Sequence, residues 1–203
     1  MWAKESGTIK MTGGSIDVRK LHIQTPIGIE AMSNGALILN NVKIEASNQD
    51  QRIKTIDATG ASLKKGGTLS MTGGSIKANY LGVALEESNS DKNELKNVKI
   101  DLMGLATAEK ESIGISAIKT SKITLKQATI THARTSIYAS DHSQITISGG
   151  FIQGDHTGIN VEKESVVTLK DKIEVLSNDH GLSANGDFLQ TVCNQKLPCE
   201  EEN

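Results

Sequence analysis

Apolar and polar residues alternate along most of this chain in short runs, and the runs recur at a nearly regular interval. Seven apolar residues anchor the runs: Met11, Leu39, Met71, Leu95, Leu125, Ile147 and Leu169. The position two before each anchor is apolar except at Asn93, and the position five after it is isoleucine in six of the seven runs. A period of two is typical of a half-buried β-strand. Each run therefore predicts two short strands separated by a corner.

The corner is marked by the residue two positions after each anchor. This column holds Gly13, Asn41, Gly73, Asn97, Gln127, Gly149 and Asp171. Glycine and asparagine adopt a positive φ angle at the lowest cost, so they suit a tight change of direction. The sequence MTGGSI, which occurs at residues 11–16 and again at 71–76, contains this corner twice.

A third strand follows most corners after a connection of variable length. The candidates are 27–31, 81–85, 113–117, 136–139, 157–161 and 181–184. Three strands within a shortest interval of 22 residues predict an all-β fold, a right-handed parallel β-helix of about seven rungs with three short strands per rung. In the last run Ile173 comes one position early, so we expect a change of register there.

The predicted helix divides the chain into three parts. We expect residues 1–6 to be a start segment outside the rod, residues 7–192 to form the β-helix, and residues 193–203 to form a cap with an acidic tail. Cys193 and Cys199 are the two cysteines of the chain, and a disulfide between them would close the cap. Their absence from the first 192 residues fits a secreted or surface chain.

Composition and charge limit the kind of core and the classes of partner that this chain can have. Aromatic residues make up 2% of the chain, so the core must be built from small and aliphatic side chains. The net charge of −2 gives no electrostatic drive toward nucleic acid. No apolar run is long enough for a membrane span, and no signal-peptide core follows Met1, so we expect no membrane span in this chain.

Signals for catalysis are weak. Arg52-Ile53-Lys54 occurs in polygalacturonases, which are also β-helices, but the Asn-Thr-Asp, Asp-Asp and Gly-His-Gly motifs of that family are missing. No Asp cluster suited to calcium and no Gly-x-Ser-x-Gly elbow is found. We therefore expect no catalytic residue and no cofactor, and a polysaccharide-cleaving enzyme is the least favoured alternative.

His132, His156 and His180 are each 24 residues apart, which is close to the rung interval. If they stack at one corner, they form either a transition-metal site or a group that repels itself when protonated. The simpler alternative is that they are exposed turn residues without a shared role.

Insertions beyond the shortest interval are expected to leave the rod as loops, where repeat proteins often place binding. The predicted loops are 47–51, 62–67, 86–91 and 107–111. As candidate partner-binding residues we take Ser47, Asn48, Gln49, Asp50, Glu86, Glu87, Asn89 and Asp91. Lysines also recur at fixed places, as Lys96, Lys126 and Lys170 after the anchor and Lys43 and Lys99 three positions later. They would meet a sulfated glycan or keep an exposed sheet soluble.

The segments Ile145–Ile152 and Thr157–Val161 give a rhythm that resembles the passenger repeats of bacterial autotransporters of the pertactin-like type. The likeness covers residues 7 to about 192 and is nearest to the Bartonella-type angiogenic autotransporters. It implies a secreted or surface-displayed passenger, exported through an outer-membrane barrel that this chain does not include. Its partner would be a host-cell surface protein, in the angiogenic case an endothelial receptor tyrosine kinase. A structural stalk that carries another domain is the alternative.

Overall fold

The computed structural model describes residues 1–19, 25–46, 57–103 and 111–185, and within them the only regular elements are β-strands. The strands are β1 (Trp2–Ala3), β2 (Thr8–Thr12), β3 (Ser15–Asp17), β4 (Ile27–Met32), β5 (Ala36–Glu45), β6 (Thr59–Lys64), β7 (Thr68–Lys77), β8 (Leu81–Glu86), β9 (Asn89–Lys96), β10 (Lys99–Asp101), β11 (Ile113–Ile118), β12 (Lys122–Ala139), β13 (Gln144–Glu162), β14 (Val166–Ser177) and β15 (His180–Asn185). Four predicted features lie wholly or mostly outside the described residues: the loop 47–51, the loop 107–111 except Glu111, the Arg52-Ile53-Lys54 motif, and the cap with Cys193 and Cys199.

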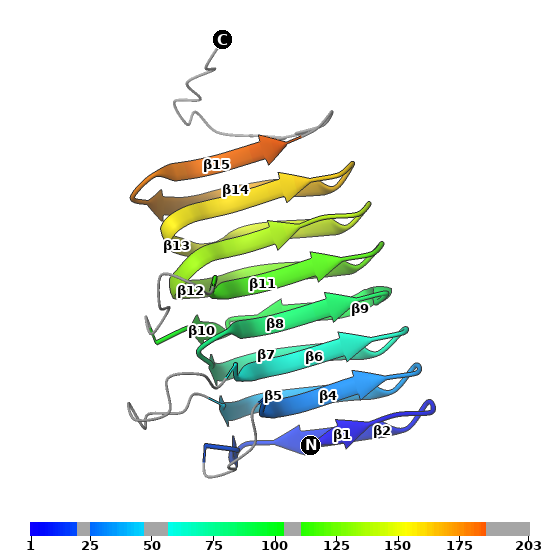
Figure 1. Cartoon of the computed structure of the whole chain (residues 1–203). Coiled ribbons are helices and arrows are strands. Elements are labelled where there is room, and N and C mark those ends of the chain that lie inside the picture. The colour runs from blue at the N-terminus through cyan, green and yellow to red at the C-terminus, as the bar shows by residue number, and fades with distance from the viewer. Residues whose placement is uncertain (20–24, 47–56, 104–110, 186–203) are drawn as a thin grey trace.

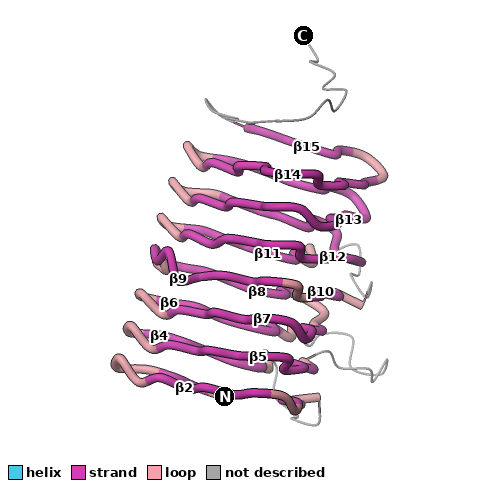
Figure 2. The backbone as a smooth tube through the Cα atoms, turned by 180° about the vertical axis from the view of Figure 1, so that it is seen from behind, coloured by secondary structure: helices cyan, strands magenta, loops and turns pink. Residues whose placement is uncertain are grey.

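The strands stack as the rungs of a parallel β-helix, as the alternation predicts. Every strand pairing is parallel, and the chain climbs from β1 at one end of the rod to β15 at the other (Figure 1). The view from behind shows the same stack, with strands in magenta and the loops and turns that join them in pink (Figure 2). Among the described residues, no helix has the length and apolar character needed to cross a membrane.

The rod has three faces, each formed by one set of stacked strand segments. The first face is formed by the strand segments before each corner, in β2, β5, β7, β9, β12, β13 and β14. The second face is formed by the segments after the corner. The third face runs through β1, β4, β6, β8, β11, the last parts of β12 and β13, and β15.

The corner column behaves as predicted. All seven of its residues have positive φ, from 51° at Gln127 to 67° at Gly13. The register change at Ile173 is also confirmed, because Ile173 lies beside Gly150 and Val175 takes the place beside Ile152. The inserted residue is next to Asp171, whose φ of 64° continues the column.

One continuous apolar core fills the rod. Its columns include Leu39, Met71 and Leu95 from the anchors and Ile44 and Ile76 from the second face, all fully buried. Stacking of like side chains on successive rungs lets these columns pack without aromatic rings. The core opens at the first rung, where the residues that point inward are only partly buried: Ile9, Met11 and Ile16.

A glycine column on the third face keeps that face close to the second. A Cβ placed on Gly82 would lie 2.4 Å from the carbonyl oxygen of Gly114 and 2.5 Å from Cγ2 of Ile100. Glycine is required there by space, because a carbonyl and a buried methyl group already fill it. This packing explains the glycine that recurs in the third strands.

Two sequence-based boundaries differ from the structure. The rod begins at β1, where Trp2 and Ala3 pair with Glu30 and Ala31, so part of the expected start segment belongs to the first rung. The loop expected at 62–67 is wrong, because Ser62–Lys64 lie in β6. Ala61 and Leu63 are buried there, so this polar-looking stretch is an ordinary third strand with small inward residues.

Candidate functional site

Strand β9 interrupts the regular stack. Asn89 pairs with Lys122 and Glu94 pairs with Thr124 on β12, so five steps along β9 match two steps along its neighbour. The three extra residues are Ser90, Asp91 and Lys92, which form a bulge on the first face. Toward β7, pairing begins only at Ser70 with Glu94, so the start of β7 has no backbone partner in β9.

The side chain of Asn93 replaces the missing backbone of the interrupted strand. Its Oδ1 accepts a hydrogen bond of 3.1 Å from the backbone N–H of Leu69 on β7, and its Nδ2 donates one of 2.9 Å to the carbonyl of Lys122 on β12. The same Nδ2 also donates to the carbonyl and the hydroxyl oxygen of Ser88. Asn93 is fully buried. A side-chain amide therefore carries the ladder across the bulge.

Serines continue this polar core at the adjoining turns. The backbone N–H of Ser88 donates to Oγ of Ser121, that of Ser121 to Oγ of Ser143, and that of Ser143 to Oγ of Ser165. All four side chains are buried. The ladder fixes the turns above the bulge, so the bulge projects from a rigid frame.

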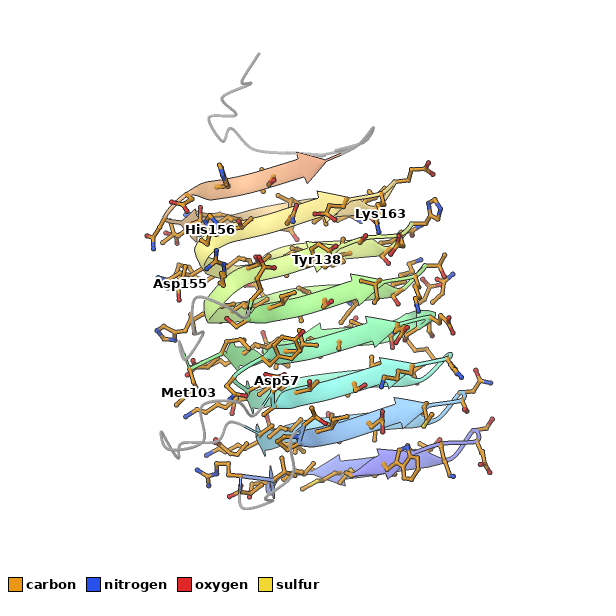
Figure 3. All side chains as sticks on the ribbon, viewed as in Figure 1. Asp57, Met103, Tyr138, Asp155, His156 and Lys163 are labelled. Atoms are coloured by element: carbon orange, nitrogen blue, oxygen red, sulfur yellow. The ribbon has the colours of Figure 1, made fainter. Side chains whose placement is uncertain are left out.

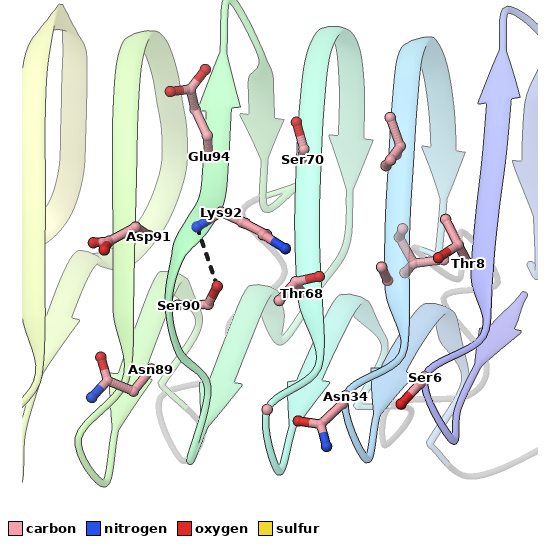
Figure 4. Close-up of a pocket in the computed structure, with 14 residues that line it drawn as sticks. Ser6, Thr8, Asn34, Thr68, Ser70, Asn89, Ser90, Asp91, Lys92 and Glu94 are labelled. Atoms are coloured by element: carbon pink, nitrogen blue, oxygen red, sulfur yellow. Dashed lines mark hydrogen bonds between the residues drawn. The ribbon is translucent and has the colours of Figure 1, made fainter.

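A hollow of about 790 Å³ lies beside the bulge on the first face (Figure 4). Its floor consists of outward side chains of β2, β5 and β7, namely Thr8, Ala36, Ile38, Thr68 and Ser70. One wall is the bulge together with Asn89 before it, and the turn residues Ser6, Asn34 and Gly66 border the other side. The floor is flat because the strands are in register, and it carries small hydroxyl, methyl and methylene groups.

The charges around the hollow are unequally paired. Asp91 forms an ion pair of 2.5 Å with Lys122, and Glu94 forms one of 2.5 Å with Lys126. Lys92 is exposed, and within the described part of the chain its ammonium has no ion-pair partner. Its side chain points from β9 toward β7 (Figure 4). The acids of the bulge are thus compensated, and the lysine is not.

The candidate partner-binding residues separate into three groups. Ser47, Asn48, Gln49 and Asp50 lie outside the described residues. Asn89 and Asp91 line the hollow. Glu86 ends β8 on the third face and is paired with Lys119, and a hydrogen bond from that ammonium holds the pKa of the Glu86 carboxyl below its ordinary value. Glu87 has a φ of 54° in the turn that follows.

The structure brings together two of the three histidines. The rings of His156 and His180 lie 6.1 Å apart, and Nδ1 of His156 contacts the carboxylate of Asp179. His132 instead contacts Asp101, with 2.9 Å between Nδ1 and Oδ1.

The register explains the separation, because β12 has a shift between Ile130 and Ala133 that places His132 in a bulge. His156 lies at the edge of the rod, with Asp155 close by and Lys163 at the opposite edge (Figure 3). Among the described residues, no three His, Cys, Asp or Glu side chains gather in a way that could hold a metal ion.

The recurring lysines lie in columns on the first and second faces, as predicted, but a serine interrupts each column. Lys96 and Lys126 are neighbours on adjacent strands, and Ser148 separates Lys126 from Lys170. On the second face, Ser75 separates Lys43 from Lys99. Of these two adjacent lysines, Lys96 ends β9, the strand that carries the bulge, and Lys126 lies beside it on β12.

Sequence reasoning missed the two residues that define the site. Asn93 was visible as the one polar residue in an apolar column, and that exception was the available signal. Lys92 gave none, because its position depends on where the three extra residues leave the strand.

Comparison with known proteins adds no relative: no family model, no curated protein and no solved structure matches the chain. Fold and site together define the class of protein as a parallel β-helix with a hydroxyl-lined hollow on one face.

Proposed function

We propose that this chain is a non-enzymatic binding rod, a secreted or surface-displayed passenger of the autotransporter type that contacts a host-cell surface molecule through the hollow beside β9. The observation that carries the proposal is the bulge with its buried Asn93. A regular rung would place an aliphatic residue in that column, as the other six runs do.

Departure from the repeat is informative because it has a cost. Bulges interrupt ladder hydrogen bonds, and families keep them where they re-aim side chains. A place where a sequence breaks its own local rules is expected to be a functional or a strained site. A stalk has no need for a bulge, whereas a binding rod needs a place where its otherwise uniform surface changes.

A straightened variant tests the proposal. Deleting Ser90–Lys92 and replacing Asn93 with isoleucine gives β9 the same number of residues as its neighbour, with an apolar residue opposite Ile123. This variant should fold, because it restores the rung that the rest of the chain uses.

The assay is binding of the labelled chain to cultured endothelial cells, with phosphorylation of receptor tyrosine kinases measured in parallel. We expect the wild-type chain to bind and the straightened variant to lose binding. Equal binding by the two chains would show that the hollow is not the site. Absence of binding by the folded wild-type chain would refute the binding function and favour the stalk.

A further inference from the structure

We infer that the occupant of the hollow is an acidic glycan, a polysaccharide carrying sulfate or carboxylate groups, that lies along the rod axis across the first face. This inference rests on the proposed binding function and names the chemical class of the partner.

The floor presents hydrogen-bonding groups at a regular spacing. Register places Thr8, Ala36 and Thr68 side by side in one row and Lys10, Ile38 and Ser70 in the next. A third row, toward the corner, holds Thr12, Asn40 and Thr72. Adjacent strands are about 4.8 Å apart, so the polar groups of Thr12, Asn40 and Thr72 repeat along the axis at that interval, and the hydroxyls of Thr8 and Thr68 at twice that interval. Hydroxyl and amide groups both donate and accept hydrogen bonds, as sugar hydroxyls do. Ala36 and Ile38 offer apolar contact to the C–H faces of a sugar ring.

Three cations surround this floor. Lys10 lies in the row of Ile38 and Ser70, Lys92 extends from the bulge, and Lys96 follows the anchor of β9. All three are exposed, and none has an ion-pair partner among the described residues. Lys126, beside Lys96 on the neighbouring strand, is by contrast paired with Glu94. An anionic chain would pair with the three free ammonium groups, those of Lys10, Lys92 and Lys96.

The third face lacks this charge pattern. A groove there runs over Ser62, Ala84 and Ser116, but the lysines at its border are already paired, Lys64 with Glu30 and Lys119 with Glu86. Within the part of the molecule that the structure describes, the lysines beside the third-face groove are therefore paired, whereas those beside the first-face hollow are not.

The test is direct binding of the full chain to fluorescent oligosaccharides of equal length. The probes are a sulfated heparin-derived oligosaccharide, a carboxylated oligogalacturonate and a neutral dextran oligosaccharide, with polyglutamate as a polyanion that is not a glycan. We expect one or both acidic oligosaccharides to bind, and the neutral one to bind at least tenfold more weakly. Binding should weaken as salt rises, because exposed charges are screened.

Two lysines of like exposure provide matched variants. Lys92→Glu reverses a charge at the hollow, and Lys172→Glu makes the same change at an exposed residue of β14 at the far end of the rod. Loss of a charge-assisted contact should weaken binding of the acidic oligosaccharide by about tenfold or more for Lys92→Glu. The Lys172→Glu change should leave it within about twofold. Circular dichroism confirms that both variants fold.

The outcomes distinguish this inference from the proposed function. Binding of the sulfated probe alone assigns a sulfated glycan, and binding of the carboxylated probe as well assigns acidic glycans in general. Equal losses in the two lysine variants, or polyglutamate binding as tightly as the glycans, would overturn the inference. If no glycan binds but the straightened variant loses cell binding, the partner is of another class and the proposed function stands. If neither glycan nor cell binding is observed, both fail.

Discussion

Replacing Asn93 with leucine should destabilise the protein, although leucine suits the column in which Asn93 lies. Six of the seven runs have an apolar residue at this place, so a reading of the column alone predicts stabilisation. In the structure the Asn93 amide is bonded to the N–H of Leu69 and to the carbonyls of Lys122 and Ser88. Leucine would leave the N–H of Leu69 and the carbonyl of Lys122 buried without their partner, whereas the carbonyl of Ser88 still accepts a hydrogen bond from the N–H of Lys122.

The magnitude follows from opposing terms. Each buried polar group left unpaired costs about 1–3 kcal/mol, so the N–H of Leu69 and the carbonyl of Lys122 together cost about 4 kcal/mol. Burial of a leucine side chain returns about 2 kcal/mol. The net destabilisation is about 2 kcal/mol, and its sign is opposite to that expected from the column.

Urea unfolding followed by circular dichroism measures this difference through the midpoint, provided that the slope is unchanged. Ile145→Leu, an aliphatic exchange at the equivalent position of β13, is the control and should cost less than about 1.5 kcal/mol. Asn93→Asp keeps the shape and the accepting oxygen but replaces the donor, so it should also destabilise. An Asn93→Leu protein as stable as wild type would refute the assignment of the amide as a substitute for the backbone.

Three further predictions concern other parts of the rod. Gly82→Ala should lower the free energy of unfolding by about 2–3 kcal/mol, because the new Cβ meets the Gly114 carbonyl and Ile100. Gly181→Ala is the control: the nearest atom to its new Cβ is 4.0 Å away, so the free energy of unfolding should change by less than about 0.5 kcal/mol. Equal effects of the two changes in urea unfolding would contradict this packing. Among the described residues, the buried hydroxyl of Ser136 has no hydrogen-bond partner, and it lies where β11 has Gly114, so Ser136→Gly should raise the free energy of unfolding by about 1 kcal/mol; a lower urea midpoint than that of wild type would show that the hydroxyl is satisfied. Lys119→Met should raise the pKa of Glu86, which NMR titration measures. Because the pair with Lys119 lowers the pKa of Glu86 in the folded protein, its contribution to stability is present above the ordinary glutamate pKa and is lost as pH falls through the folded value. An unchanged Glu86 titration would contradict the pairing.

The architecture could be predicted because each rung repeats the same local solution. Inward residues such as Leu39 and Met71 alternate with outward ones, and the corner needs a positive φ that glycine and asparagine supply. These are local properties of the chain, and stacking copies them from rung to rung. The same logic located the register change at Ile173.

Features that depend on register between rungs could not be predicted in this way. The histidine column failed because one extra residue near His132 moves it away from the line of His156 and His180. The turns that join the third face to the first also gave no signal. They contain pairs of residues with positive φ, including Lys119-Thr120 and Lys163-Glu164. Such residues do not favour this conformation by themselves, so the stacked neighbours must impose it.

The hollow and its free charge arise from the same three residues, and this determines how the experiments must be combined. Removing Ser90–Lys92 abolishes the wall of the hollow and the unpaired ammonium together, so the straightened variant alone cannot separate shape from charge. Lys92→Glu keeps the wall and Asn93 in place and changes only the charge. If both variants lose binding, charge is required; if only the straightened variant does, the shape of the bulge is what the partner recognises.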